Sequence, residues 1–174
     1  MTEEDYVRAL GVTALGTRLR RFFERLNGPV TALYRRELGF EQRWFALTLL
    51  LQARGPCAVG EAAARLGVSH PAVLQAAGAM EAHGLLSKTR DPADARSSLL
   101  ALTPKGARVA KKVNAVSRRV DAAATALLAE AAPDLLQNLD ALEDALGRRS
   151  FAERLQGADA DDERPAENRR RKIR

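Results

Sequence analysis

The sequence is poor in residues on which several protein classes depend. It holds a single cysteine, Cys57, among 174 residues, so no disulfide can form within the chain and a reducing compartment is expected. Aromatic residues make up only 5%, which disfavours a β-sandwich and fits helices rich in alanine and leucine. No run approaches the roughly 20 apolar residues that cross a bilayer. The acidic N-terminus does not resemble a signal peptide. The sequence therefore predicts a cytoplasmic protein without a membrane partner.

Motifs of catalysis, metal binding and cofactor binding are also missing. There is no glycine-rich phosphate loop, nucleophile elbow or His-Glu metal helix. The two histidines, His70 and His83, lack cysteine or carboxylate neighbours at metal-ligand spacing. Cys57 is expected to be a small, semi-buried residue, with a redox-sensing thiol as the alternative. We therefore predict no enzyme activity, no metal and no cofactor.

The composition that is present fits a helical, polyanion-binding protein. A hydrophobic content of 46% suffices for a core, and the net charge is +6. A basic balance of this kind favours polyanionic partners, although it does not determine a fold. The length corresponds to one domain, or to one domain with arms.

Helical periodicity dominates the first part of the chain. Apolar residues between 4 and 26 recur every three or four positions, Gly28-Pro29 is expected to interrupt that helix, and residues 29–38 resume it. Residues 41–54 are apolar on most sides, which is typical of a central helix.

Two short helices with a glycine between them follow. The pattern predicts a helix over 60–66, a left-handed exit at Gly67, and a second helix over 69–83 with Ser69 as its N-cap. Val73, Ala77 and Met80 fall on the side of this second helix that should face the core.

A hairpin and long closing helices complete the chain. Runs 85–89 and 97–102 are predicted to be strands around a polar loop. Thr103-Pro104 starts a long helix that Pro133 breaks, and a final helix ends near residue 155. The tail from Gly157 is too polar to fold and is expected to be disordered.

The order of these elements resembles the MarR family of bacterial transcription regulators. The strongest match is the stretch 94–106, which is similar to the family's wing signature, Asp-x-Arg followed by Leu-x-Leu-Thr-x-x-Gly. Residues 81–86, Arg90-Asp91-Pro92 and Trp44 also fit the family pattern.

The resemblance implies a mainly α fold with a small β-hairpin wing. Such a fold is a winged helix-turn-helix whose long N- and C-terminal helices form a dimerisation region. We expect that region over 4–39 and 104–155, the DNA-binding winged helix over 40–103, and a disordered basic tail over 156–174. Residues 69–84 contain no Lys or Arg, whereas many relatives have basic residues there. We therefore expect the wing to contribute more of the affinity for DNA.

Candidate site residues follow from the helix-turn-helix pattern and from the resemblance. Arg96 is the implied minor-groove arginine of the wing, and Asp94 is the acid expected to hold it. Gln75 suits a bidentate contact with adenine, and Ala72 suits a thymine methyl group. The full DNA-contacting set is Ser69, His70, Ala72, Val73, Gln75, Lys88, Arg90 and Arg96.

These residues lead to one main hypothesis and one alternative. The main hypothesis is a homodimeric, sequence-specific regulator, in the first instance a repressor, that binds double-stranded DNA at an inverted repeat. A small aromatic or phenolic effector could release it from a pocket lined by Phe22, Trp44 and Phe45, although aromatic residues at helical spacing are more often core. The alternative is a winged-helix protein-interaction or dimerisation module that does not read DNA.

Overall fold

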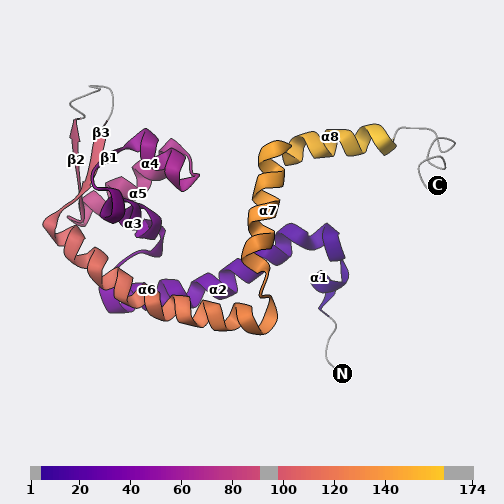
Figure 1. The fold of residues 1–174 in the computed structure, drawn as a ribbon, viewed down its shortest axis with the longest axis horizontal. Coiled ribbons are helices and arrows are strands. Elements are labelled where there is room, and N and C mark those ends of the chain that lie inside the picture. The colour runs from indigo at the N-terminus through magenta and orange to yellow at the C-terminus, as the bar shows by residue number, and fades with distance from the viewer. Residues whose placement is uncertain (1–4, 91–97, 163–174) are drawn as a thin grey trace. The chain divides into compact units, whose positions relative to one another are not determined.

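The computed structural model describes residues 5–90 and 98–162, with side chains through residue 158. The chain divides into two compact units, Met1–Asp121 and Ala122–Arg174. Figure 1 shows the elements of both units.

The first unit begins with a helical arm. α1 (Tyr6–Ala9) and the 3₁₀ turn η1 (Gly11–Ala14) precede α2 (Leu15–Leu38). The helix expected from residue 4 is therefore divided, because Gly11 has a positive φ of 57°. The carboxylate of Asp5 caps α1 by accepting from the Arg8 N–H, and it also pairs with Arg21 on α2 at 2.8 Å.

The expected break at Gly28-Pro29 is wrong, because α2 continues through Pro29. A proline ring clashes with the Cβ of the residue before it when that residue is helical. Glycine has no Cβ, so Gly28 removes this part of the penalty and the helix passes through. α2 ends instead at Gly39, whose φ of 58° lies in the left-handed region.

A central helix and a helix-turn-helix follow. The 3₁₀ turn η2 (Gln42–Trp44) leads into α3 (Phe45–Arg54), and α4 (Val59–Leu66) packs on α5 (His70–Ala82). As the sequence predicts, Gly67 ends α4 with a φ of 63°.

A three-stranded antiparallel sheet lies beside these helices, in the order β1-β3-β2. β2 (Leu86–Arg90) pairs with β3 (Ser98–Leu102), and Leu86 faces Leu102 in the register. β1 (Cys57–Ala58), which the sequence analysis did not predict, adds to β3 through the pair Cys57–Leu100. A two-residue strand carries too short a pattern to be recognised.

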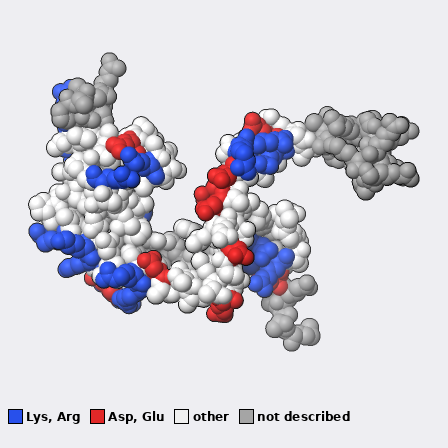
Figure 2. All heavy atoms as spheres, viewed as in Figure 1, with Lys and Arg blue, Asp and Glu red and all other residues white. Residues whose placement is uncertain are grey.

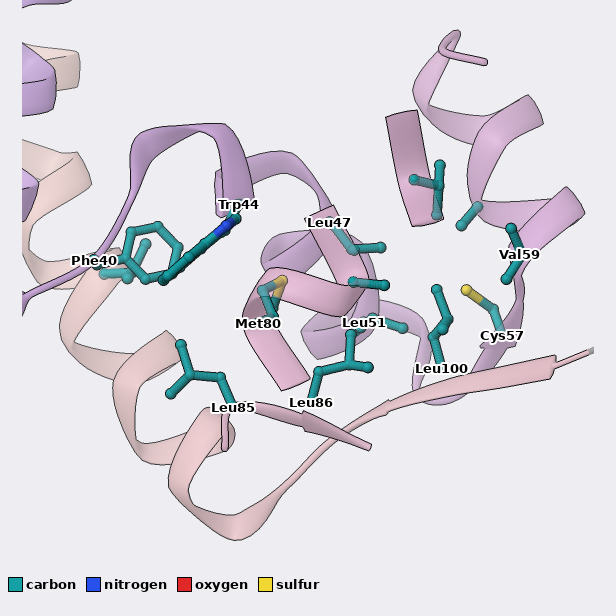
Figure 3. Packing of buried hydrophobic residues seen from close by; sticks show 14 of the residues in the cluster. Phe40, Trp44, Leu47, Leu51, Cys57, Val59, Met80, Leu85, Leu86 and Leu100 are labelled. Atoms are coloured by element: carbon teal, nitrogen blue, oxygen red, sulfur yellow. The ribbon is translucent and has the colours of Figure 1, made fainter. Parts of the chain in front are cut away.

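The core of the first unit lies between α3, α5 and the sheet (Figure 3). Trp44, Met80 and Leu100 are at most 1% exposed. The ring of Phe40 meets that of Trp44 edge-on at 5.6 Å, and Tyr34 extends the aromatic group toward α2. This packing rigidly joins the helix-turn-helix to the base of the hairpin.

α6 (Pro104–Ala131) closes the first unit with its N-terminal part. Gly106, Ala110, Val113 and Val116 are buried along one side of the helix. Polar pairs flank this side: the Tyr34 hydroxyl lies 2.8 Å from Ser117 Oγ, and Asn114 donates to Gln52 at 3.0 Å. The start of α6 is therefore tied to both α2 and α3.

The second unit contains the end of α6, α7 (Leu135–Arg148) and α8 (Phe151–Asp162). The expected break at Pro133 is confirmed. The single final helix is wrong, since the chain breaks again at Arg149 and Ser150 begins a new capped helix. Ser150 and Glu153 form a reciprocal capping box, in which each backbone N–H donates to the other's side chain.

This second capped helix also changes the expectation for the tail. Residues 156–162, expected to be disordered, are helical, while 163–174 lie outside the described residues. Among the described helices, none is both long enough and apolar enough to span a bilayer. The mainly α fold with a small sheet is confirmed.

Candidate nucleic-acid interface

The first part of α5 presents a short, uncharged surface to solvent. Ser69 caps the helix, with its Oγ accepting the Ala72 N–H at 3.4 Å. His70, Ala72 and Gln75 are exposed, as the sequence analysis expects. The His70 ring lies against the start of α4, since a Cβ on Gly60 would sit 3.2 Å from its Cε1.

The expectation that Val73 contacts DNA is wrong. Val73 is only 2% exposed and belongs to the hydrophobic core, where Ala77 and Met80 lie one and two turns further on. Its side chain therefore has no access to a ligand. The residue that the sequence analysis missed is its neighbour Leu74, which is 47% exposed. The helical spacing that places Val73 inside places Leu74 about 100° away, outside the core.

A cation from the hairpin lies beside α5, which contains no Lys or Arg. Lys88 on β2 extends over α5, where its Nζ lies 3.8 Å from the position that a Cβ on Gly78 would occupy. The same Nζ lies 3.4 Å from Oε2 of Glu81. Arg90 is exposed at the far end of β2, opposite Ser98 in the register. The hairpin thus holds one basic side chain against the recognition helix and a second one further along the same strand.

Hydrogen bonds fix the end of α5 against the start of α6. The Thr103 hydroxyl donates to the Gly84 carbonyl at 2.7 Å and accepts from the Gly106 N–H at 3.0 Å. Lys105 Nζ donates to the His83 carbonyl at 2.8 Å. Gly106 allows this approach because a Cβ there would lie 1.9 Å from the Leu85 carbonyl oxygen. These contacts therefore hold the end of α5 against the start of α6.

The loop between β2 and β3 carries the residues that the family resemblance assigns to the wing tip. Asp94 and Arg96 lie outside the described residues, so their roles remain predictions from the sequence.

Figure 2 shows several separate patches of basic and acidic side chains, some of them next to each other, on a mostly uncharged surface. Part of this pattern reflects pairs within or between helices, such as Arg65 with Glu61 on α4 at 2.8 Å. The segment 104–120 differs, because it contains no acidic residue. Its basic residues are Lys105, Arg108, Lys111, Lys112, Arg118 and Arg119. Of these, Arg119 pairs with Glu37 of α2 at 2.8 Å.

The expected effector pocket is not assembled from the residues that the sequence analysis named. Trp44 is 1% exposed and lies in the core, Phe22 is 47% exposed on α2, and Phe45 packs its ring 5.9 Å from that of Tyr34. Trp44 thus belongs to the core, as the alternative interpretation stated, whereas Phe22 is exposed, which neither interpretation predicted.

A cavity of about 330 Å³ lies near them, between α2 and the η2 turn. Its lining residues are Phe23, Asn27, Thr31, Glu41, Gln42 and Arg43. Thr31 Oγ1 donates to Gln42 Oε1 at 2.9 Å across it. Arg35 pairs with Glu41 at 2.8 Å and holds the pKa of that carboxyl below its usual value. The cavity thus offers one aromatic ring, neutral polar groups, the guanidinium of Arg43 and the carboxylate of Glu41, which Arg35 pairs.

The sulfur of Cys57 is not placed for redox chemistry in this fold. The residue is 3% exposed at the edge of the core, and burial raises the pKa of its thiol. A thiol with a raised pKa carries little of the reactive thiolate at neutral pH.

Comparisons with known proteins agree with this geometry. Residues 38–97 match the sequence model of the MarR family. No curated protein sequence matches the chain. Many solved structures do match it, and transcriptional regulators are prominent among them.

One is the transcriptional repressor CouR bound to a 23-mer DNA duplex, at 28% identity over 78% of this chain and 96% of CouR, with a TM-score of 0.64. Another is the PcaV regulator of Streptomyces coelicolor with its natural ligand, at 24% identity over 86% of this chain and 99% of PcaV, with a TM-score of 0.60. The third is the regulator BldR of Sulfolobus solfataricus, at 21% identity over 82% of this chain and 99% of BldR, with a TM-score of 0.61. Nearly the whole length of each relative is matched by part of this chain.

Proposed function

We propose that this chain is a DNA-binding transcriptional regulator of the MarR type that acts as a homodimeric repressor on an inverted-repeat operator; the match of residues 38–97 to the MarR family model and the similarity to DNA-bound CouR support this. Two recognition helices and two wings would then meet successive major and minor grooves, about 34–36 Å apart. The observation that carries this proposal is the exposed, capped first half of α5 beside Lys88.

Unburied apolar residues on the N-terminal arm support dimerisation. Val12 is 86% exposed and Phe23 is 59% exposed, in a helix region that otherwise has a clear apolar side. The exposed set on this arm is Tyr6, Leu10, Val12, Leu15, Leu19, Phe22, Phe23 and Leu26. Exposed apolar surface of this extent is typical of a protein interface.

The second unit carries a similar set. α7 buries none of its residues, and Leu136 and Leu142 are 62% and 61% exposed. α8 adds Phe151 and Leu155, four residues apart and therefore on one side of the helix. Helices with such faces are stable when another helix covers them, and a second copy of the chain would provide it.

Light scattering after size exclusion tests the dimer. We expect the wild-type protein to elute with twice the chain mass, and Leu19→Glu with Phe22→Glu to shift it toward the monomer. Ala53→Glu, on an exposed position of α3, is the control and should remain dimeric. A monomeric wild-type protein would refute the proposal.

Wing binding is tested with Arg96→Ala. A guanidinium inserted into a narrow minor groove contributes to affinity and to salt dependence. In gel shifts with the promoter region beside its own gene, we expect weaker binding and a log K against log salt slope that is less steep by about 0.9. Arg36→Ala, at an exposed position on α2, is the matched control. Unchanged affinity and slope in Arg96→Ala would remove the wing from the interface.

The uncharged surface of the first part of α5 favours one alternative, a module that binds protein instead of DNA. Its outcome is distinct, since the wild-type protein would then shift no duplex at low salt and would retain protein partners in a pull-down.

A small aromatic effector completes the proposal, with the cavity between α2 and η2 as its site. Its volume of about 330 Å³ suits a single-ring ligand, which could stack on Phe23 and pair an acidic group with Arg43. A ligand there would change the affinity for DNA by favouring one relative arrangement of the two winged helices of the dimer. Arg43→Gln should abolish release from DNA by a panel of hydroxybenzoates without weakening DNA binding itself.

A further inference from the structure

The first half of α5 ends in a large apolar side chain that the fold does not cover. Leu74 is 47% exposed and Val68, in the turn before the helix, is 44% exposed. The side chains of Val73 and Ala77 on the same helix are almost completely buried. Leu74 therefore contributes little to the core and exposes apolar surface to water.

The groups around Leu74 on this surface favour a nucleic acid as the partner that covers it. Ser69, His70 and Gln75 offer hydrogen-bonding groups on the same half of the helix, and no acidic residue lies between 69 and 80. Lys88 lies across the following turn at Gly78. An apolar centre with neutral polar neighbours and a cation at its border suits base edges flanked by phosphates.

The position of Leu74 along the helix matters as well. The helix begins at His70, so Leu74 and Gln75 lie within its second turn. In helix-turn-helix proteins the N-terminal residues of the second helix contact base edges in the major groove. The major groove has one apolar feature, the methyl group at C5 of thymine, and 5-methylcytosine carries the same group at the same place.

We propose that Leu74 reads a pyrimidine 5-methyl group in the major groove and thereby helps to determine the operator sequence. The inference rests on the proposed DNA-binding function and names the chemical group that this part of the site recognises. The dimer faces proposed above lie on other elements, α1 to α2 and α7 to α8, so a second copy is not required to cover Leu74.

The test removes single methyl groups from the DNA. A duplex is first recovered by the wild-type protein from a randomised pool at about 50 mM salt. Each thymine is then replaced in turn by deoxyuridine, which lacks only the methyl group, and each cytosine by 5-methylcytosine. We expect about a fourfold loss of wild-type affinity at the thymine that Leu74 contacts, or about a fourfold gain at a cytosine if a cytosine occupies that position.

Variants of Leu74 connect this effect to one side chain. Leu74→Ala should bind the deoxyuridine and thymine duplexes within twofold of each other, whereas Leu74→Met, which keeps an apolar side chain of similar size, should retain the discrimination. Because Leu74 is half-exposed, both variants should keep the wild-type circular dichroism and melting temperature.

The outcomes separate this inference from the function on which it rests. Failure of the wild-type protein to recover any duplex contradicts the DNA-binding proposal itself. A recovered duplex in which no substitution changes wild-type affinity, or in which Leu74→Ala discriminates as the wild type does, overturns the role of Leu74 and leaves DNA binding intact.

Discussion

Lys88 and Glu81 form an ion pair between the hairpin and the recognition helix, with Nζ and Oε2 3.4 Å apart. The pair places an amine beside Gly78 on a helix that has no basic residue of its own. Because Gly78 has no side chain, the Lys88 amine can lie close to the backbone of α5. The hairpin thus supplies the cation that the helix sequence lacks.

Lys88 and Glu81 are expected to change DNA affinity in opposite directions. Lys88→Gln should weaken binding almost uniformly across duplex sequences and reduce the salt slope by about 0.9, because a phosphate contact carries no base specificity. Glu81→Gln should tighten binding several-fold, since it removes a negative charge from the face that meets phosphates. Titrations by fluorescence anisotropy at several salt concentrations measure both. The matched control Glu24→Gln, which breaks the Arg20 pair on α2, should bind as the wild type does. Equal weakening by both substitutions would contradict the assignment.

Gly106→Ala should destabilise the first unit strongly. A Cβ at this position would lie 1.9 Å from the Leu85 carbonyl oxygen, so the start of α6 must move away from the turn before β2. We expect the free energy of unfolding to fall by about 3 kcal/mol in urea titrations followed by Trp44 fluorescence. Gly16→Ala, at a helical position with nothing within 4 Å, is the control and should be neutral or slightly stabilising. A Gly106→Ala protein as stable as the wild type would show that α6 does not need this close contact.

Stability toward acid should depend on the pair between Glu37 and Arg119. The hydrogen bond from Arg119 lowers the pKa of the Glu37 carboxyl below its ordinary value of 4.5. A lowered pKa in the folded state means that the pair stabilises fully above about pH 4.5, and that this contribution is lost as the pH falls through the lowered pKa. Glu37→Gln should remove this part of the decline in melting temperature between pH 5 and pH 3, and Arg119→Gln should remove the larger share of it, because Arg36 also pairs with Glu37 at 3.4 Å. A double variant with a larger effect than either single one would show that the two residues act separately.

Cys57 should react slowly with thiol reagents in the native protein. Burial raises the pKa of its thiol and shields the sulfur. We expect labelling by iodoacetamide at pH 8 to be far slower than for a free thiol, and to accelerate to that rate in urea. DNA binding should be unchanged after mild peroxide treatment. Rapid native labelling would restore the redox-sensing alternative.

Local chemistry made much of the fold predictable. The helix-turn-helix followed from a serine that caps α5, a glycine with positive φ that ends α4, and core-facing residues at helical spacing. These signals act within a few residues of one another, so an isolated sequence already contains them. The hairpin and the long closing helix followed from the same kind of signal.

The errors arose where a distant part of the chain decides the outcome. The sequence analysis included Val73 among the DNA contacts, although its own pattern placed that residue toward the core, and it did not consider Leu74. Trp44 was named as a possible lining residue of an effector pocket, with the core as the more common role, and Phe40 and His83 pack against its ring. Sequence spacing shows which residues share a side of a helix, but not which side is covered.

The sequence alone thus determined the helix-turn-helix with its caps, the hairpin strands and the start of the long closing helix, because backbone hydrogen bonding and steric restriction act locally. Only the tertiary structure decided that Cys57 joins β3, that Lys88 reaches Gly78, and that Leu74 stays exposed. Each of these three facts depends on residues that lie far apart in the chain and meet only in the folded protein. Which side chains remain accessible for binding is then decided by burial, and burial does not depend on distance along the sequence.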